Sequence, residues 1–290
     1  MRPRKPDAIA PPANWIYLSS KPAAGEPHCK IVYRAALFVS VGTYLIVFVQ
    51  YRPAKDVWAF GVEPAKVKYR LRLARYPAMA ETLAEWLNTR SESAAEPLKL
   101  VDVGAGFGRT FLYLQAQGIA QRFDLLGVDI APDRKDDVYA DNPWRIIAGD
   151  AEQPLDFADA SFDVVVSEQL LEHLHNPQQL IAEFHRILKP DGLLIVGVPI
   201  FPEPIAKLRR YLVKQYGLRG SDHIQTYSLR SIRRDLAPYF AEAEARGFRI
   251  ISGGLLRKLE NYSWWYRINR RLGRWLPGLC IEIQLLMTRK

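Results

Sequence analysis

Short apolar segments alternate with helical patterns through the middle of the chain, and this alternation restricts its fold more than any other feature. Between residues 98 and 198 the apolar segments read LKLVDV, DLLGVDI, WRIIAG, FDVVVS and GLLIVGV. Apolar residues recur at helical spacing over 109–117 and 177–188. Strands that are apolar on both faces are typical of a parallel sheet with helices on each side. We therefore predict an α/β fold with a doubly wound, mostly parallel sheet.

The last third of the chain extends this pattern. A basic amphipathic segment begins at Ile205, and the segment SLRSIRRDLAPYF that follows it has helical spacing. The segments GFRIIS, at 247–252, and CIEIQLLMT, at 280–288, are expected to be strands. With these two segments the predicted sheet has seven strands.

The N-terminal quarter differs in composition from the rest. Residues 1–27 are rich in proline and are expected to form an extended or disordered leader. Residues 28–76 form an apolar and basic extension that includes the uncharged run AALFVSVGTYLIVFVQY at 35–51. A run of this length fits a buried strand or helix, and it also fits a membrane anchor or interfacial segment. We place the main domain at 77–290, where a helical pattern begins.

Charge is distributed unevenly along the chain, although the formal net charge is +9. Residues 1–76 carry +9, residues 77–204 carry −12 and residues 205–290 carry +12. Basic flanks can attract anionic lipid, nucleic acid or an acidic substrate, or they can simply keep the surface solvated. The two cysteines, Cys29 and Cys280, have neither the spacing of metal ligands nor that of a disulfide framework. We therefore expect a reducing compartment and no metal site.

The sequence VDVGAGFGRT at 101–110 leads from an apolar strand into a helix. Gly104, Gly106 and Gly108 lack a Cβ, so a ligand can lie against the backbone there and reach the unpaired N–H groups of the helix N-terminus. The dinucleotide-binding pattern G-x-G-x-x-G requires a third glycine where this chain has Arg109. A nicotinamide-dependent oxidoreductase is therefore disfavoured. The glycine-rich turn by itself does not show whether it binds a ligand or is only a tight structural turn.

With Asp102 the turn reads D-x-G-x-G-x-G, which resembles motif I of the class I S-adenosylmethionine-dependent methyltransferases. The segments LLGVDI, AGDAEQPLDF, SFDVVVSEQLLEHL and LKPDGLLIVGVP resemble the other motifs of that family in order and spacing. The resemblance covers about residues 77–252 and is closest to the type 11 group, which includes quinone-biosynthesis enzymes. It implies a Rossmann-like methyltransferase fold, methyltransferase activity and S-adenosyl-L-methionine as the cofactor.

The resemblance also implies which residues bind the cofactor. Asp129 ends its strand where the family places a carboxylate that accepts hydrogen bonds from both ribose hydroxyls. Asp150 and the backbone of Ala151 match the pair that reads adenine. The complete set of implied positions is Asp102, Gly104, Ala105, Gly106, Gly108, Asp129, Ile130, Asp150, Ala151, Ser167 and Gln169.

Two histidines are candidates for a catalytic base. Methyl transfer from a sulfonium requires alignment and a dry pocket, and it requires a base only when the acceptor is a phenol or hydroxyl. His173 lies in LLEHL beside the cofactor motif, and His223 lies in the segment 205–225, which faces the substrate in the family. We favour His223. Each histidine also fits an ordinary structural role, at a helix end or in a surface loop.

The nature of the acceptor depends on the segments around the motifs. The chain has SEQL where methyltransferases that act on base amines carry N/D-P-P-Y/F/W, so nucleic acid is not expected as a partner. The segment 255–278 mixes tryptophan and tyrosine with arginine, which fits a membrane headgroup layer, a grip on a phosphate-bearing substrate, a lid, or a helix covering the sheet. Together with 35–51 and 205–219 it favours a small or lipid-linked acceptor handled at an anionic membrane surface.

The sequence thus predicts a methyltransferase that is cytoplasmic, either free or attached to the inner face of a membrane. A non-catalytic scaffold or assembly protein of the same fold is the alternative. The alternative is disfavoured because all the cofactor positions are present, including the glycines of the first turn.

Overall fold

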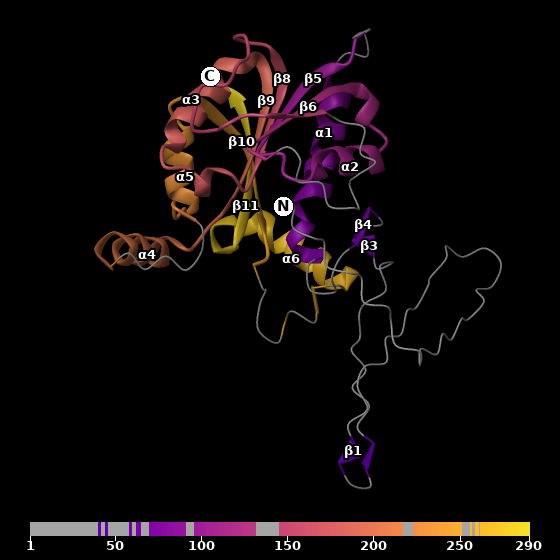
Figure 1. Ribbon diagram of the computed structural model, residues 1–290, viewed down its shortest axis with the longest axis vertical. Coiled ribbons are helices and arrows are strands. Elements are labelled where there is room, and N and C mark those ends of the chain that lie inside the picture. Colours follow the sequence, from indigo (N-terminus) through magenta and orange to yellow (C-terminus); the bar gives the residue numbers. More distant parts are fainter. Residues whose placement is uncertain are drawn as a thin grey trace, which may run out of the picture. The chain divides into compact units, whose positions relative to one another are not determined.

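The computed structural model contains 290 residues and includes one seven-stranded sheet (Figure 1). By their internal contacts the residues divide into two units, Met1–Trp58 and Ala59–Lys290, and the sheet belongs to the second. The leader at 1–27 and most of the run at 35–51 lie outside the described residues, and the start of the main domain at residue 77 stays a prediction. The described residues are 40–41, 44–45, 58–59, 62–64, 70–90, 96–131, 145–216, 223–250, 256, 259–260 and 262–290.

The seven strands are β5 (Leu98–Val103), β6 (Phe123–Asp129), β7 (Arg145–Ala148), β8 (Phe162–Glu168), β9 (Leu188–Pro199), β10 (Phe240–Phe248) and β11 (Glu282–Arg289). Their order in the sheet is β10-β11-β9-β8-β5-β6-β7. The strands from β9 to β7 pair in parallel, and β11 is antiparallel to both of its neighbours. The prediction of a doubly wound, mostly parallel, seven-stranded sheet is therefore confirmed. The strand order reverses beside β5, and open sheets of this type bind ligands at such a reversal, outside the carboxyl ends of the strands.

Helices cover both faces of the sheet. The helices are α1 (Arg75–Thr89), α2 (Arg109–Ala116), α3 (Pro177–Ile187), α4 (Glu203–Tyr216), α5 (Leu229–Leu236) and α6 (Ser263–Trp275). Apolar residues of α1 and α2 pack on one face, and those of α3 and α5 pack on the other. Val164, Val165 and Val166 of β8 are fully buried. Consecutive strand residues point to opposite faces, so this burial requires both faces to be covered.

The strand β10 lies earlier in the sequence than predicted. The sequence pattern placed this strand at 247–252 and continued the preceding helix to Phe240, whereas the strand occupies Phe240–Phe248 and α5 ends at Leu236. Alanine and glutamate in FAEAEARGF favour a helix in isolation. Here the segment pairs with β11 along its whole length, and this tertiary pairing outweighs the local preference.

The bounds of α2 and α3 agree closely with the sequence. Gly118 follows α2 with a φ of +75°, in the left-handed conformation expected of a glycine that closes a helix. Asn176 and Pro177 occupy the N-cap and the first turn of α3, but the Asn176 side chain makes no capping hydrogen bond. The segment LKPDG was expected to be a turn; instead β9 begins at Leu188, directly after the helix.

The N-terminal segments that the structure describes are short. Within the run at 35–51, β1 (Ser40–Val41) pairs with β2 (Tyr44–Leu45) in an antiparallel hairpin. A second two-stranded sheet joins β3 (Trp58–Ala59) to β4 (Glu63–Pro64). Among the residues described, no helix combines the length and the apolar character needed to cross a bilayer.

Candidate active site

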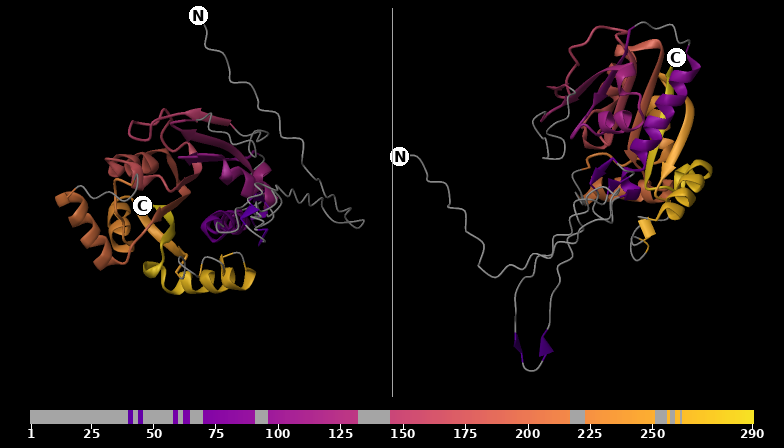
Figure 2. Two further views of the ribbon diagram at one scale, coloured as in Figure 1. Left: turned by 60° about the horizontal axis from the view of Figure 1, so that its bottom comes forward. Right: turned by 90° about the vertical axis from the view of Figure 1, so that its right-hand side faces the viewer.

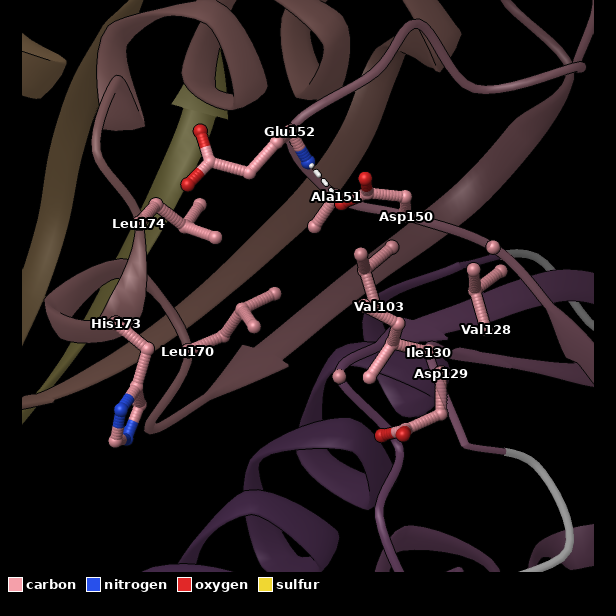
Figure 3. Close-up of a pocket in the computed structure, with 12 residues that line it drawn as sticks. Val103, Val128, Asp129, Ile130, Asp150, Ala151, Glu152, Leu170, His173 and Leu174 are labelled. Carbon is pink, nitrogen blue, oxygen red and sulfur yellow. Dashed lines mark hydrogen bonds between the residues drawn. The ribbon is translucent and has the colours of Figure 1, made fainter. Parts of the chain in front are cut away.

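A pocket of about 250 Å³ lies at the carboxyl ends of β5 and β6 (Figure 3). Four separate segments contribute to its wall: the turn after β5, the end of β6, the loop after β7 and the loop after β8. This is the place where the strand order predicts a ligand site. The lining residues are Val103, Gly104, Val128, Asp129, Ile130, Gly149, Asp150, Ala151, Glu152, Leu170, His173 and Leu174.

The turn between β5 and α2 depends on glycine. Gly104 has a φ of +82°, which L side chains rarely adopt, and a Cβ added there would lie 3.1 Å from the side chain of Leu170. The backbone N–H of Gly104 donates to the carbonyl of Val128 at 2.8 Å, so the turn is fixed to β6. Gly106 and Gly108 also have positive φ values, of +54° and +77°. Gly104 is among the residues that line the pocket, so the turn contributes bare backbone to its wall.

Asp129 holds the same turn from the end of β6. One carboxylate oxygen accepts from the N–H of Gly106 and the other from the N–H of Ala131, both at 2.9 Å. Each oxygen of a carboxylate can accept more than one hydrogen bond. Asp129 consequently fixes the turn and still has acceptor capacity on the wall of the pocket.

Asp102 lies beneath the turn and is not among the lining residues. It is buried, and its Oδ2 accepts from the hydroxyl of Thr110 in α2 at 2.6 Å. Burial raises its pKa to about 7, a shift that the Thr110 hydrogen bond opposes. Asp102 therefore ties the strand to the helix that follows the turn.

The loop after β7 is fixed by short-range and cross-loop hydrogen bonds. Asp150 accepts from the N–H of Glu152 at 2.9 Å, the dashed bond in Figure 3. Glu152 in turn accepts from the backbone N–H of His175 at 2.7 Å and faces the ring nitrogen of His175 at 2.9 Å. The backbone bond from His175 is the main reason why the pKa of Glu152 is lowered. Glu152 thus links the loop that carries Asp150 and Ala151 to the loop after β8.

Buried polar residues gather at the end of β8. The carboxylate of Glu168 accepts from the side-chain amide of Gln284 at 2.6 Å and lies 3.2 Å from Nε of Arg75. Arg75 also donates to Glu282 at 3.1 Å. Burial raises the pKa of Glu168 to about 7, and the charge of Arg75 limits the rise. A Cβ on Gly197 of β9 would overlap the Glu168 carboxylate, so glycine is required there too.

Glu172, His173 and His223 form a second group beyond this strand end. Glu172 is fully buried, and neither of its carboxylate oxygens accepts a hydrogen bond from the described part of the chain. Burial raises its pKa to about 8. Its backbone carbonyl accepts from the N–H groups of Ile224 and Gln225, at 2.8 and 2.9 Å, which fixes the segment that carries His223.

The two histidines predicted as catalytic bases lie together. Their rings meet edge to face with centroids 4.9 Å apart, and Nε2 of His173 lies 3.9 Å from a Glu172 oxygen. His173 lines the pocket, whereas His223 is not among the lining residues and is partly buried. The three side chains offer ligand atoms within 4.8 Å of one another and could hold a metal ion. The expectation that the chain has no metal site stays a prediction.

The structure brings together many of the residues implied to bind a cofactor, but not all of them line the pocket. Gly104, Asp129, Ile130, Asp150 and Ala151 do so. The other implied residues belong to the turn after β5 or to the ends of β5 and β8, outside the pocket lining. Among these, Ser167 is buried, and Gln169 has a φ of +58° with a side-chain amide nitrogen that has no partner among the described residues. The remaining implied positions outside the lining are Asp102, Ala105, Gly106 and Gly108.

Sequence reasoning missed several residues of the site. Glu172 stands next to His173 in LLEHL, and a buried carboxylate beside a candidate base could have been noticed there. Glu152 stands directly after Ala151 in the same motif. No signal in the sequence identifies Arg75 or Gln284, because they reach Glu168 from segments 93 and 116 residues away and only the fold brings them close.

Residues 101–196 match the family model described as a methyltransferase domain. The matched segment contains the Gly104 turn, the Asp129 strand end and the His173 loop, and it includes every residue that lines the pocket.

Curated relatives match over a similar region. The chain is 29% identical over 135 residues to the ubiquinone biosynthesis O-methyltransferase of Maricaulis maris, an alignment that covers 45% of this chain and 52% of that protein. It is 28% identical over 144 residues to the malonyl-[acyl-carrier protein] O-methyltransferase of Laribacter hongkongensis, covering 45% and 46%. A solved SAM-dependent methyltransferase from Thermotoga maritima is 18% identical with a TM-score of 0.47, covering 76% of this chain and 92% of that chain. The chain spans about half the length of the curated relatives it matches.

Proposed function

We propose, on the premise that residues 101–196 are a class I S-adenosylmethionine-dependent methyltransferase domain, that this chain moves a methyl group from S-adenosyl-L-methionine to an oxygen of a small or lipid-linked acceptor. One observation carries the proposal. Gly104 and Asp129 come from different strands, yet they line one pocket together with Asp150 and Ala151. These are positions that the motif order assigns to the turn, the ribose and the adenine.

The residues present fit this cofactor. Gly104 lines the pocket with bare backbone, and its missing Cβ lets the Leu170 side chain pack closely against the turn. Asp129 has acceptor capacity on both oxygens after its bonds to Gly106 and Ala131, which suits the two hydroxyls of a ribose. Asp150 and Ala151 face the same space from the loop after β7.

When bound, S-adenosyl-L-methionine supplies a methyl group that is already activated on a positively charged sulfur. The residues of the chain then have to hold the acceptor in line and keep water out of the pocket. Leu170 and Leu174 form an apolar wall next to His173, and Figure 3 shows Leu170 lying between His173 and the side of the pocket formed by Asp129.

His173 is placed to take the proton of a hydroxyl acceptor, because it is the histidine that lines the pocket. In that role the imidazole would take the proton of the acceptor hydroxyl, so that the oxygen could accept the methyl group as the methyl–sulfur bond breaks and S-adenosylhomocysteine leaves. His223 packs against the His173 ring and restricts its orientation. The Glu172 carboxyl lies 3.9 Å from His173 Nε2, and its ionised form, which prevails only above its raised pKa of about 8, would stabilise the protonated imidazole.

Two features support an oxygen acceptor that can be amphipathic. The ubiquinone biosynthesis and malonyl-[acyl-carrier protein] relatives are O-methyltransferases by name. Residues 205–290, which follow the segment matched by the family model, carry a net charge of +12, which suits an anionic or phosphate-bearing acceptor.

A labelled-methyl transfer assay on cell extract separated into polar and lipid fractions tests the function. We expect transfer to one fraction by the unaltered chain and its loss in Asp129→Ala, together with calorimetric binding of S-adenosylhomocysteine and none of a nicotinamide dinucleotide. The variant His173→Gln should lose transfer and keep cofactor binding, while His185→Gln, on α3 and outside the pocket lining, should retain both. Binding of the cofactor product without transfer to any fraction would instead support the scaffold alternative.

A further inference from the structure

We propose that the outward face of α6, together with α4, binds an anionic lipid surface and brings the end of the sheet that carries the pocket to that surface. The proposal concerns a surface outside the pocket, and it can stand or fail independently of the methyl-transfer function.

A row of large apolar side chains lies on the solvent side of α6. Trp264, Ile268 and Trp275 are separated by four and seven residues, a spacing that places them within one narrow stripe of a helix. Their exposed fractions are 46%, 40% and 83%. The apolar surface continues past the end of the helix through Leu276 and Leu279, which are also exposed. Large apolar side chains exposed in this number over one short segment indicate an interaction site.

Arginines flank the same stripe. Arg267, Arg271 and Arg274 are exposed and repeat at spacings of four and three residues along the helix. An in-plane membrane helix has this composition, with tryptophan and aliphatic residues entering the headgroup region and basic residues facing anionic lipid.

The inner face of α6 fixes the orientation of this stripe. Trp265 and Asn269 are buried, and Gly273 packs directly against the backbone of Gly247 in β10. Arg270 forms an ion pair with Glu81 of α1. The exposed tryptophans therefore cannot turn inward to join the core, because the opposite face of the helix is already packed.

α4 presents a second basic and apolar surface at the same end of the sheet. It begins four residues after β9 ends, and α6 leads into the start of the antiparallel strand β11, so both helices lie beyond the carboxyl ends of the parallel strands (Figures 1 and 2). Ile205, Leu208 and Tyr211 of α4 are exposed, and Lys207 is exposed beside them. The pocket lies at the carboxyl ends of β5 and β6, at this same end of the sheet. A membrane contacted by both helices would thus lie at the end of the sheet that carries the pocket.

Lipid fits this surface better than nucleic acid does. Nucleic-acid sites rely on basic side chains with aromatic rings that stack on bases, and aliphatic residues have little part in them. Here Ile268, Leu276 and Leu279 extend the surface between and beyond the tryptophans. The net charge of +12 over residues 205–290 complements an anionic headgroup layer.

Co-sedimentation of the full chain with vesicles tests the proposal. We expect binding to vesicles of equal parts phosphatidylcholine and phosphatidylserine, weakened by salt, and little binding to phosphatidylcholine alone. The variant Trp264→Ala/Trp275→Ala should lower the partition coefficient by about tenfold or more, and Arg267→Gln/Arg271→Gln should lower it less and reduce its dependence on salt. A matched control is Arg122→Gln/Arg145→Gln, which removes two exposed arginines from the opposite edge of the sheet and should bind like the unaltered chain.

Circular dichroism and calorimetric titration with S-adenosylhomocysteine complete the test. All variants should remain folded and bind this ligand equally, so that a failure of the pocket is distinguished from a failure of the surface. The proposal is overturned if the α6 variants bind vesicles as tightly as the unaltered chain, which would assign binding to another segment. It is also overturned if they lose affinity for an oligonucleotide but not for vesicles.

Discussion

The turn around Gly104 and the polar cluster around Glu168 lie at the ends of adjacent strands, but they are built in different ways. The turn is held by backbone bonds and by Asp129, a residue on the next strand that accepts two backbone N–H groups. The cluster is held by side chains from α1, β8 and β11, and some of its buried polar atoms have no hydrogen-bond partner among the described residues. Burial raises the pKa of Glu168 in this cluster and of Glu172 in the group next to it.

The two regions should therefore respond to substitution in different ways. A side chain that bonds only to nearby backbone groups, such as Asp129, can be replaced with a small loss of unfolding free energy. Its replacement should therefore be detected mainly as weaker ligand binding. Replacing a buried charged residue whose partner comes from a distant segment should change the free energy of unfolding and its dependence on pH.

Removal of Arg75 from the cluster should cost more stability than any other substitution considered below. Arg75→Met leaves Glu168 and Glu282 buried next to each other without one of their cations, and we expect the free energy of unfolding to fall by about 3–5 kcal/mol. Urea denaturation measures this loss. The matched control is Arg233→Met, which breaks an exposed pair with Glu242 and should cost at most about 1 kcal/mol. Equal losses in the two variants would contradict the distinction between the regions.

The pH dependence of stability tests Glu172. The pKa of Glu172 is raised from 4.5 to about 8 in the folded chain, so the folded state binds more protons than the unfolded state between these values. Its contribution to stability is then greatest at low pH and declines as the pH rises through this window, by up to about 1.4 kcal/mol per pH unit. Glu172→Gln should remove this decline, so its stability relative to the unaltered chain should increase from pH 5 to pH 8 in urea titrations.

Glu152 provides a control of opposite sign. Its pKa is lowered, mainly by the backbone N–H of His175, so its contribution is present at neutral pH and is lost on acidification. Glu152→Gln should therefore differ most from the unaltered chain at neutral pH and converge with it in acid. A Glu172→Gln curve parallel to that of the unaltered chain would show that the buried carboxyl does not titrate in this window.

Asp129→Ala should act on ligand binding. The variant removes the carboxylate that we propose accepts hydrogen bonds from two ribose hydroxyls, and we expect calorimetric binding of S-adenosylhomocysteine to weaken by about 1.5–3 kcal/mol. The loss of its bonds to Gly106 and Ala131 should lower the free energy of unfolding by less than Arg75→Met does. Unchanged affinity would remove Asp129 from the cofactor site and with it the assignment of the turn to ligand binding.

The comparison also shows what the sequence could predict. The strands of the parallel sheet and the Gly104 turn follow from local signals, namely apolar runs, glycine spacing and a carboxylate at a strand end. The strand β10 was misplaced because its alanines and glutamates favour a helix until β11 pairs with them. The contacts of Glu168 with Arg75 and Gln284 could not be predicted, since they depend on packing between distant segments that no local pattern records.

Alanine substitutions at two glycines should have small effects, and they distinguish backbone strain from an effect on ligand binding at the Gly104 turn. Gly106 and Gly118 both have positive φ values, of +54° and +75°, and a Cβ would have open space or ordinary contact at each. Alanine at either position should therefore cost about 1 kcal/mol of unfolding free energy through backbone strain alone. Only Gly106→Ala should also weaken the binding of S-adenosylhomocysteine, because the N–H of Gly106 sets the position of Asp129, whereas Gly118 closes α2 away from the pocket lining. Denaturation and calorimetry on the two variants check this, and equal losses of affinity would mean that the turn acts on the ligand through general destabilisation of the fold.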